Sequence, residues 1–86
     1  MEYELNGVNL IVHLPGELDH HSVRTLPQDI ELLFGEYEIR RIIFDFSAVT
    51  FMDSSGIGAV LGRYKRMCER DGDITLYGMN RRTRKL

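Results

Sequence analysis

The sequence predicts an α/β fold with a mixed β-sheet, in a chain whose 86 residues suffice for one domain. Two observations support this prediction. Short stretches with strand character flank the dipeptide Asn6-Gly7, which is typical of an antiparallel hairpin. Strand-like and helix-like stretches then alternate, which implies right-handed crossovers and parallel pairing of the later strands.

The hairpin strands are predicted over residues 2–6 and 8–14. In the second strand apolar side chains occupy every other position, which indicates one buried face. These positions are Val8, Leu10, Val12 and Leu14. Pro15-Gly16 ends the strand, and a polar loop over residues 17–22 follows.

A first helix follows this loop, because apolar residues recur at steps of three and four. They are Val23, Leu26, Ile30 and Leu33. Pro27 conflicts with a start at Ser22, since proline in a helix interior removes a backbone hydrogen bond and crowds the carbonyl of Val23. Either the first turn is distorted or the regular helix begins nearer Thr25. Gly35 is the expected C-terminal cap.

The remaining elements are a central strand over residues 41–46, a helix over residues 54–70 and a strand over residues 74–77. Asn80 is the expected N-cap of a third helix. We place six apolar residues along one side of the second helix: Ile57, Val60, Leu61, Tyr64, Met67 and Cys68. The predicted order is β-β-α-β-α-β-α, with the helices mainly on one face of the sheet.

Charge is divided unevenly, since residues 1–59 carry a net charge of −7 and residues 60–86 one of +5. Two interpretations stay open. The bases form a solvated helix face and tail, or they form a patch for an acidic partner or for nucleotide phosphates. Nucleic-acid binding is disfavoured, because the pI is about 5.9 and no aromatic residues are interleaved with the bases.

The single cysteine cannot close an internal disulfide, and the three histidines and Cys68 lack metal-binding spacing. We expect Cys68 to be a small buried hydrophobic residue rather than a reactive thiol. No apolar run is long enough to cross a membrane, and the acidic N-terminus lacks a signal-peptide core. These features predict a cytoplasmic protein with no metal, cofactor or membrane contact.

The most informative segment is residues 51–58, Phe-Met-Asp-Ser-Ser-Gly-Ile-Gly, between a predicted strand and a predicted helix. Asp and Ser are preferred N-caps, because their side-chain oxygens accept orphan backbone N–H groups. Gly56, Gly58 and Gly62 are unusual, since a glycine costs a helix about 1 kcal/mol relative to alanine. Either they allow close packing on the sheet, or they leave a bare surface for a partner or nucleotide. Both explanations can hold for different glycines.

An exposed Ser54 hydroxyl at a helix N-terminus suits a phosphate, since the helix dipole and free N–H groups favour an anion. A catalytic serine is disfavoured, because the segment lacks the first glycine of a nucleophile elbow. A serine–histidine–aspartate set can be assembled on paper, but so short a chain offers little pocket for it. The glycines do not complete a dinucleotide or Walker motif either. We therefore predict no catalytic residues.

Residues 51–58 and 61–65 closely resemble the phosphorylation motif of STAS-domain anti-sigma factor antagonists. Residues 16–21, Gly-Glu-Leu-Asp-His-His, resemble the loop before the first helix in the same family. The resemblance covers nearly the whole chain and is greatest to antagonists of the sigma-F pathway, which act in the sporulation of endospore-forming bacteria. It implies a STAS-like domain over residues 1–86.

The resemblance also implies a mechanism. Ser54 matches the residue that receives a phosphate, and Ser55 matches its unmodified neighbour. The unphosphorylated protein would bind an anti-sigma factor that is a nucleotide-bound serine kinase, and the sigma factor would be released. Phosphorylation would end this binding, and a serine phosphatase would reset the protein. The expected partner-binding residues are Asp19, His20, His21, Met52, Asp53, Ser55, Gly56, Ile57 and Gly58.

Other interpretations stay open. A STAS regulatory domain of another stress-response pathway would share the motif, and a small nucleotide-binding α/β domain would share the fold class. Three roles stay open for His20 and His21: they sense pH, they contact a nucleotide, or they cap and pack the loop. Met52 is expected either at the partner interface or in the core. Family members usually continue through a complete third helix and a final element, so the C-terminus is expected to be truncated.

Overall fold

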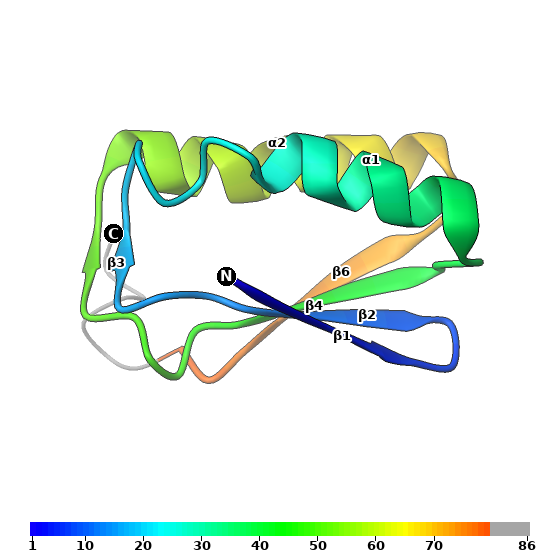
Figure 1. The fold of residues 1–86 in the computed structure, drawn as a ribbon, viewed down its shortest axis with the longest axis horizontal. Helices are drawn as coiled ribbons and strands as arrows, with labels where there is room; N and C mark the ends of the chain where they lie inside the picture. Colours follow the sequence, from blue (N-terminus) through cyan, green and yellow to red (C-terminus); the bar gives the residue numbers. More distant parts are fainter. Residues whose placement is uncertain (80–86) are drawn as a thin grey trace.

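The computed structural model describes residues 1–79. Four strands form the main sheet: β1 (Glu2–Asn6), β2 (Asn9–His13), β4 (Arg41–Asp45) and β6 (Asp73–Tyr77). Two short strands form a second sheet: β3 (Glu17–Leu18) and β5 (Phe51–Met52). The helices are α1 (Leu26–Glu36) and α2 (Ser54–Glu69), and both lie on one face of the main sheet (Figure 1). The predicted α/β fold and the order of its longer elements are confirmed for these residues, and the two-residue strands β3 and β5 are additional.

The main sheet is mixed, as the hairpin and crossovers predicted. Its strand order is β1-β2-β4-β6, with β1 antiparallel to β2 and the other neighbours parallel. Gly7 takes a φ of 62° in the hairpin turn, a left-handed conformation that glycine adopts at little cost. Val8 lies in this turn and is exposed, so its predicted place on the buried face is wrong.

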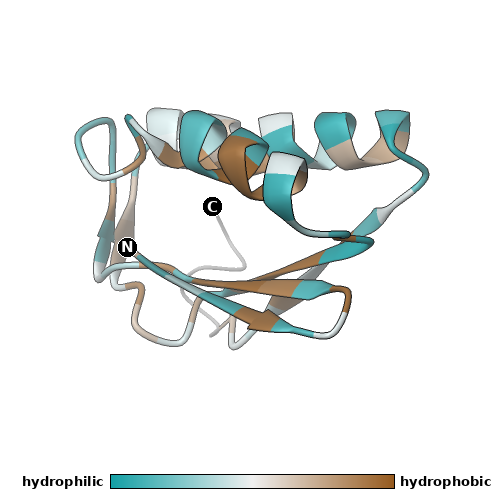
Figure 2. Cartoon of the chain, turned by 45° about the vertical axis from the view of Figure 1, so that its right-hand side comes forward, coloured by the Kyte–Doolittle hydropathy of each residue, from teal (hydrophilic) through white to brown (hydrophobic). Residues whose placement is uncertain are grey.

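The core lies between the main sheet and the two helices, where apolar residues of both layers face one another (Figure 2). Each of the fully buried pairs Leu10–Ile42 and Val12–Phe44 lies side by side on β2 and β4. Leu26 and Ile30 cover them from α1, and Val60 and Met67 do so from α2. Burial of these side chains stabilises the fold by roughly 1.5–3 kcal/mol each.

The first and last residues of α1 test two predictions, the start of the helix near Pro27 and its C-terminal cap at Gly35. The helix begins at Leu26 with Thr25 as N-cap, so Pro27 lies in the first turn, where no N–H is required. The later of the two predicted starts is therefore correct. The predicted cap at Gly35 is wrong, because the helix continues to Glu36. The extended residue Tyr37 ends it and donates its N–H to the Leu33 carbonyl at 2.9 Å.

Helix α2 buries fewer of its apolar residues than the sequence suggested. Val60 and Met67 are buried, but Leu61, Tyr64 and Cys68 are exposed. Successive helical residues point about 100° apart, so Leu61 and Cys68 turn away from the direction of Val60 and Met67. The expectation that Cys68 is buried is therefore wrong. The third helix predicted from Asn80 lies outside the described residues.

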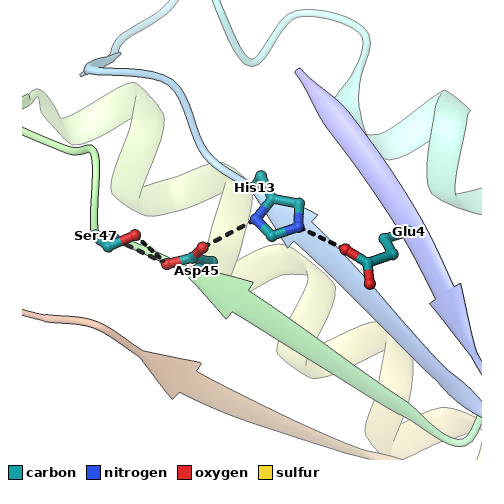
Figure 3. A network of polar contacts seen from close by, with 4 residues as sticks. All are labelled: Glu4, His13, Asp45 and Ser47. Atoms are coloured by element: carbon teal, nitrogen blue, oxygen red, sulfur yellow. Dashed lines mark hydrogen bonds and ion pairs between the residues drawn. The ribbon is translucent and has the colours of Figure 1, made fainter.

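A polar network crosses the face of the main sheet that the helices leave open (Figure 3). The two ring nitrogens of His13 lie 3.0 Å from a Glu4 carboxylate oxygen and 2.9 Å from an Asp45 carboxylate oxygen. Asp45 in turn accepts hydrogen bonds from the Ser47 hydroxyl and N–H. The hydrogen bond to Glu4, and then the one to Asp45, raise the pKa of His13. When protonated, the ring can donate to both carboxylates, and it thus links β1, β2 and β4.

This network predicts how stability depends on pH. Because the folded-state pKa of His13 is raised above its ordinary value of 6.5, its contribution is fully present below about pH 6.5 and is lost as pH rises through the raised pKa. The thermal unfolding midpoint should therefore fall over that interval. His13→Gln should remove this part of the pH dependence. A variant whose midpoint follows the same pH profile as the unmutated chain would contradict the assignment.

Candidate functional site

The small sheet of β3 and β5 brings the two sequence motifs together. Leu18 pairs with Met52, and the Leu18 carbonyl accepts a hydrogen bond from the Asp53 N–H at 3.2 Å. One step earlier, the Gly16 carbonyl accepts the Thr50 N–H at 2.8 Å. The predicted loop and the predicted connector therefore run side by side at one end of the molecule, at the left of Figure 1. Sequence reasoning missed these strands because each has only two residues.

Asp53 is the N-cap of α2. Its side chain accepts the Gly56 N–H at 2.9 Å and the His20 N–H at 3.4 Å. Ser54 is therefore the first residue of the helix, and both Ser54 and Ser55 are exposed. The sequence left three residues as candidate caps, and the structure selects the aspartate. One N–H that we expected to be free for an anion is consequently bonded to Asp53.

The glycines of α2 divide into two kinds. A Cβ at Gly56 would overlap the Leu18 carbonyl, so the missing side chain lets the helix approach β3 closely. A Cβ at Gly58 or Gly62 would meet no atom of the described chain within 4 Å. Close packing therefore explains Gly56, whereas Gly58 and Gly62 leave the helix surface bare, and the use of that surface by a partner stays a prediction. Gly58 leaves the surface beside Ser54 bare, without any packing requirement that explains it.

The loop before α1 is shaped by Asp19. Its carboxylate accepts the Ser22 N–H at 2.9 Å, and its own N–H donates to the Ser22 hydroxyl at 3.0 Å. The hydrogen bond from the Ser22 backbone is the main reason that the pKa of Asp19 is lowered. This turn presents His20 and His21 to solvent. Asp19 therefore holds the shape of the loop, and the histidines are its accessible side chains.

The predicted partner-binding residues differ in accessibility. The exposed ones are His20, His21, Ser55 and Gly58, and the partly exposed ones are Asp19, Asp53 and Ile57. Met52 and Gly56 are buried, so the structure favours the core for Met52, which the sequence left open between interface and core. Met52 faces the core and Gly56 faces β3. Phe51, 51% exposed, was not among the predicted residues, although alternation along a strand could have indicated that it points opposite to Met52.

Among residues 1–79, no three or more His, Cys, Asp or Glu side chains are arranged to hold a metal ion. Neither helix there has the length and apolar character that a bilayer crossing requires. The loop over residues 19–22 and the first turns of α2, residues 53–58, are joined by the hydrogen bond from the His20 N–H to Asp53. We call the surface that they form the switch surface.

The model of the STAS domain family matches residues 1–86. The chain belongs to the STAS domain family. This STAS chain is 34% identical over 80 residues to the anti-sigma F factor antagonist of Paenibacillus polymyxa, covering 93% of this chain and 68% of the relative. It is 36% identical over 70 residues to the protein of the same name in Lysinibacillus sphaericus, covering 78% of this chain and 60% of that relative.

Two solved structures of an anti-sigma factor antagonist are also similar to this chain. The unphosphorylated form of the anti-sigma factor antagonist SpoIIAA matches with a TM-score of 0.83 and 33% identity, over 98% of this STAS chain and 77% of the SpoIIAA chain. The phosphorylated form of SpoIIAA, described as a Bacillus cell fate determinant, matches over the same shares with a TM-score of 0.82. The fold of this STAS chain is therefore that of SpoIIAA.

Because the glycines of α2 are of two kinds, we expect alanine substitutions at Gly56 and Gly58 to change the free energy of unfolding in opposite directions. Gly56→Ala should lower the free energy of unfolding by about 2 kcal/mol or more, because the helix must move away from the Leu18 backbone. Gly58→Ala should raise it by up to about 1 kcal/mol, because alanine favours the helix and meets no obstacle. Urea denaturation of both variants measures this difference. Equal destabilisation by the two substitutions would contradict the division.

Proposed function

We propose that this STAS chain is an anti-sigma factor antagonist whose partner binding is ended by phosphorylation of Ser54. The observation that supports it most directly is the exposed Ser54 at the first position of α2, in the segment that resembles the phosphorylation motif of the family. The names of the two relatives and the fold of SpoIIAA support the same function.

In the proposed cycle, the unphosphorylated chain binds the anti-sigma factor, a serine kinase with bound nucleotide, in the cytoplasm. This binding releases the sigma factor. The kinase then transfers a phosphate to the Ser54 hydroxyl, the antagonist dissociates, and a serine phosphatase removes the phosphate. The switch surface is suited to such a partner, since exposed Ser54, Ser55 and Gly58 leave room for close backbone approach.

The phosphate would act through its charge. It adds about −1.5 to −2 charges at neutral pH, directly beside the Asp53 carboxylate and close to the loop that holds Asp19. A partner that covers this surface would have to strip water from the phosphate or place its own charges against it. Both effects oppose binding.

The fold behind the switch surface need not change. The start of α2 is held by the Asp53 cap, by Gly56 packing and by β3–β5 pairing, none of which uses the Ser54 hydroxyl. The near-equal TM-scores for the two forms of SpoIIAA are in line with this view. The proposed switch is therefore a local change in charge on a preserved surface.

The phosphate acceptor can be identified directly. Incubation of this STAS chain with its cognate anti-sigma kinase and ATP should add one phosphate, which tandem mass spectrometry should locate on Ser54. Ser54→Ala should accept none, and Ser55→Ala, the matched control one residue along, should be phosphorylated like the unmutated chain. A phosphate on Ser55 or Thr50 would refute the site, and an unmodified chain would refute the substrate role.

The effect of charge on binding is a separate prediction. Ser54→Asp should weaken binding to the anti-sigma kinase by at least roughly tenfold, equivalent to about 1.4 kcal/mol, because a carboxylate is placed beside Asp53 at the centre of the surface. Isothermal titration calorimetry measures the affinity. Ser55→Asp adds the same charge one position along and should weaken binding less. An affinity for Ser54→Asp equal to that of the unmutated chain would rule out a switch by charge.

A further inference from the structure

Strand β6 forms an outer edge of the main sheet, since the order β1-β2-β4-β6 places it last. Among residues 1–79, no strand pairs with the outer side of β6. Open strand edges readily pair with another chain, and proteins usually protect them with lysine, proline, a bulge or a very short strand. β6 has five residues, Asp-Ile-Thr-Leu-Tyr, and its register with β4 is uninterrupted. Its outer edge therefore lacks these protections.

The side chains of β6 make this edge apolar on the side of the helices. Ile74 pairs with buried Ile42 and Leu76 pairs with buried Phe44, so both point toward the helix layer. Leu76 is nevertheless 48% exposed, since no further strand among residues 1–79 lies beyond it. Thr75 points to the open face of the sheet, because side chains alternate along a strand.

The two helices divide the sheet between them, on the same face (Figure 1). α1 is tied to β1, at one edge, by the hydrogen bond of 2.9 Å from the Tyr3 hydroxyl to the Asp29 carboxylate. α2 packs against β6 at the other edge. Arg63 and Arg66 line a groove between α2 and α1, so they mark the side of α2 that faces α1. The side of α2 that is turned away from these arginines therefore borders the β6 edge.

This side of α2 carries an apolar stripe of Leu61, Tyr64 and Cys68, which recur at steps of three and four. At about 100° per residue, Tyr64 points about 100° and Leu61 about 160° away from Arg63 around the helix. Leu61 is 62% exposed, Tyr64 is 56% exposed, and Cys68 is exposed as well. Single exposed apolar residues are ordinary, but these adjoin an open strand edge that is itself apolar.

The sequence of β6 is complementary to itself. A two-fold axis perpendicular to the sheet at Thr75 would pair β6 with the same strand of a second copy in the antiparallel sense. Ile74 would then lie opposite Leu76 of the copy, and Asp73 opposite Tyr77, so no like charges meet. Thr75 would lie opposite its own counterpart, and threonine pairs are favourable across strands.

Strand β1, at the other edge of the main sheet, lacks this self-complementarity. The same operation centred on its middle residue would place Glu4 opposite Glu4 of a second copy. Like charges directly opposite each other destabilise a strand pair. The Glu4 carboxylate is also engaged by His13 at 3.0 Å. The two edges therefore differ, and β6 is the one suited to a copy of itself.

We propose that this chain forms a symmetric dimer through β6 and the apolar stripe of α2. The two main sheets join into one continuous sheet. Because the axis is perpendicular to that sheet, both copies keep their helices on the same face, and Leu61 and Tyr64 face their counterparts above the paired strands. Ser54 lies about 10 Å from Leu61 along the axis of α2, so both switch surfaces stay open. This inference does not depend on the proposed function.

Sedimentation equilibrium of the full chain tests the dimer. The unmutated chain, with a monomer mass of 10.0 kDa, should sediment with twice that mass at micromolar concentrations. Leu61→Lys and Thr75→Lys should each raise the dimer dissociation constant at least roughly tenfold, because each places like charges against each other near the axis. The matched control is Leu32→Lys, the same change at a leucine of α1 that is 70% exposed. It should leave the dimer intact.

A disulfide tests the register of β6. Thr75→Cys, combined with Cys68→Ser, should form a disulfide-linked dimer under mild oxidation. Residues directly opposite in an antiparallel pair have Cα atoms about 4.5–5.5 Å apart, which is within the range of a disulfide. Leu32→Cys with the same Cys68→Ser change is the matched control and should stay unlinked.

A dimer that both lysine variants dissociate, that Leu32→Lys does not, and that Thr75→Cys cross-links supports the proposal. A monomeric unmutated chain overturns it and leaves the proposed function intact. In that case, a lowered unfolding midpoint of Leu61→Lys would show that the stripe is covered within the chain, and weaker binding to the anti-sigma kinase would show that the kinase covers it. A dimer that persists in both lysine variants, or that fails to cross-link at Thr75→Cys, uses another surface and also overturns the proposal.

Discussion

The close approach of the first turn of α2 to the backbone of β3 is the contact on which the candidate site depends. It requires a residue without a side chain at Gly56, and the Asp53 N–H bond to the Leu18 carbonyl reinforces it. Through this contact two loops far apart in the sequence become one surface. A larger residue at this position would separate the histidine loop from the serines, even if every strand of the main sheet stayed in place.

The main sheet determines where these two loops begin. In a parallel sheet the carboxyl ends of neighbouring strands lie at one edge, and binding sites are commonly built there. His13 ends β2 and Asp45 ends β4, and the two side chains hydrogen-bond at 2.9 Å. The polar network on the open face thus joins the strand ends from which both loops depart. The network lies on the opposite side of the sheet from the helices and supports the site without belonging to it (Figure 3).

Helix α2 combines two surfaces of different chemistry. Its first turns are small and polar, and a single added charge at Ser54 would change them most. Further along, the groove between α2 and α1 is lined by charged and apolar side chains, among them Arg63, Arg66 and Leu32. The distance between Ser54 and Arg63 along the helix axis exceeds the distance over which physiological salt screens charges.

Periodicity predicted the second hairpin strand and both helices, because burial on one face imposes a repeat of two or of about 3.6 residues. The Asn6-Gly7 turn predicted the hairpin, and the alternation of strand-like and helix-like stretches predicted the crossovers. The motif resemblance was enough to single out Ser54 in the sequence. Only the tertiary structure decided that Asp53 rather than a serine caps α2, that Met52 and Gly56 point inward, and that Arg63 lines a groove. These outcomes depend on which backbone atoms of distant segments come within hydrogen-bonding or packing distance, and no local pattern specifies that.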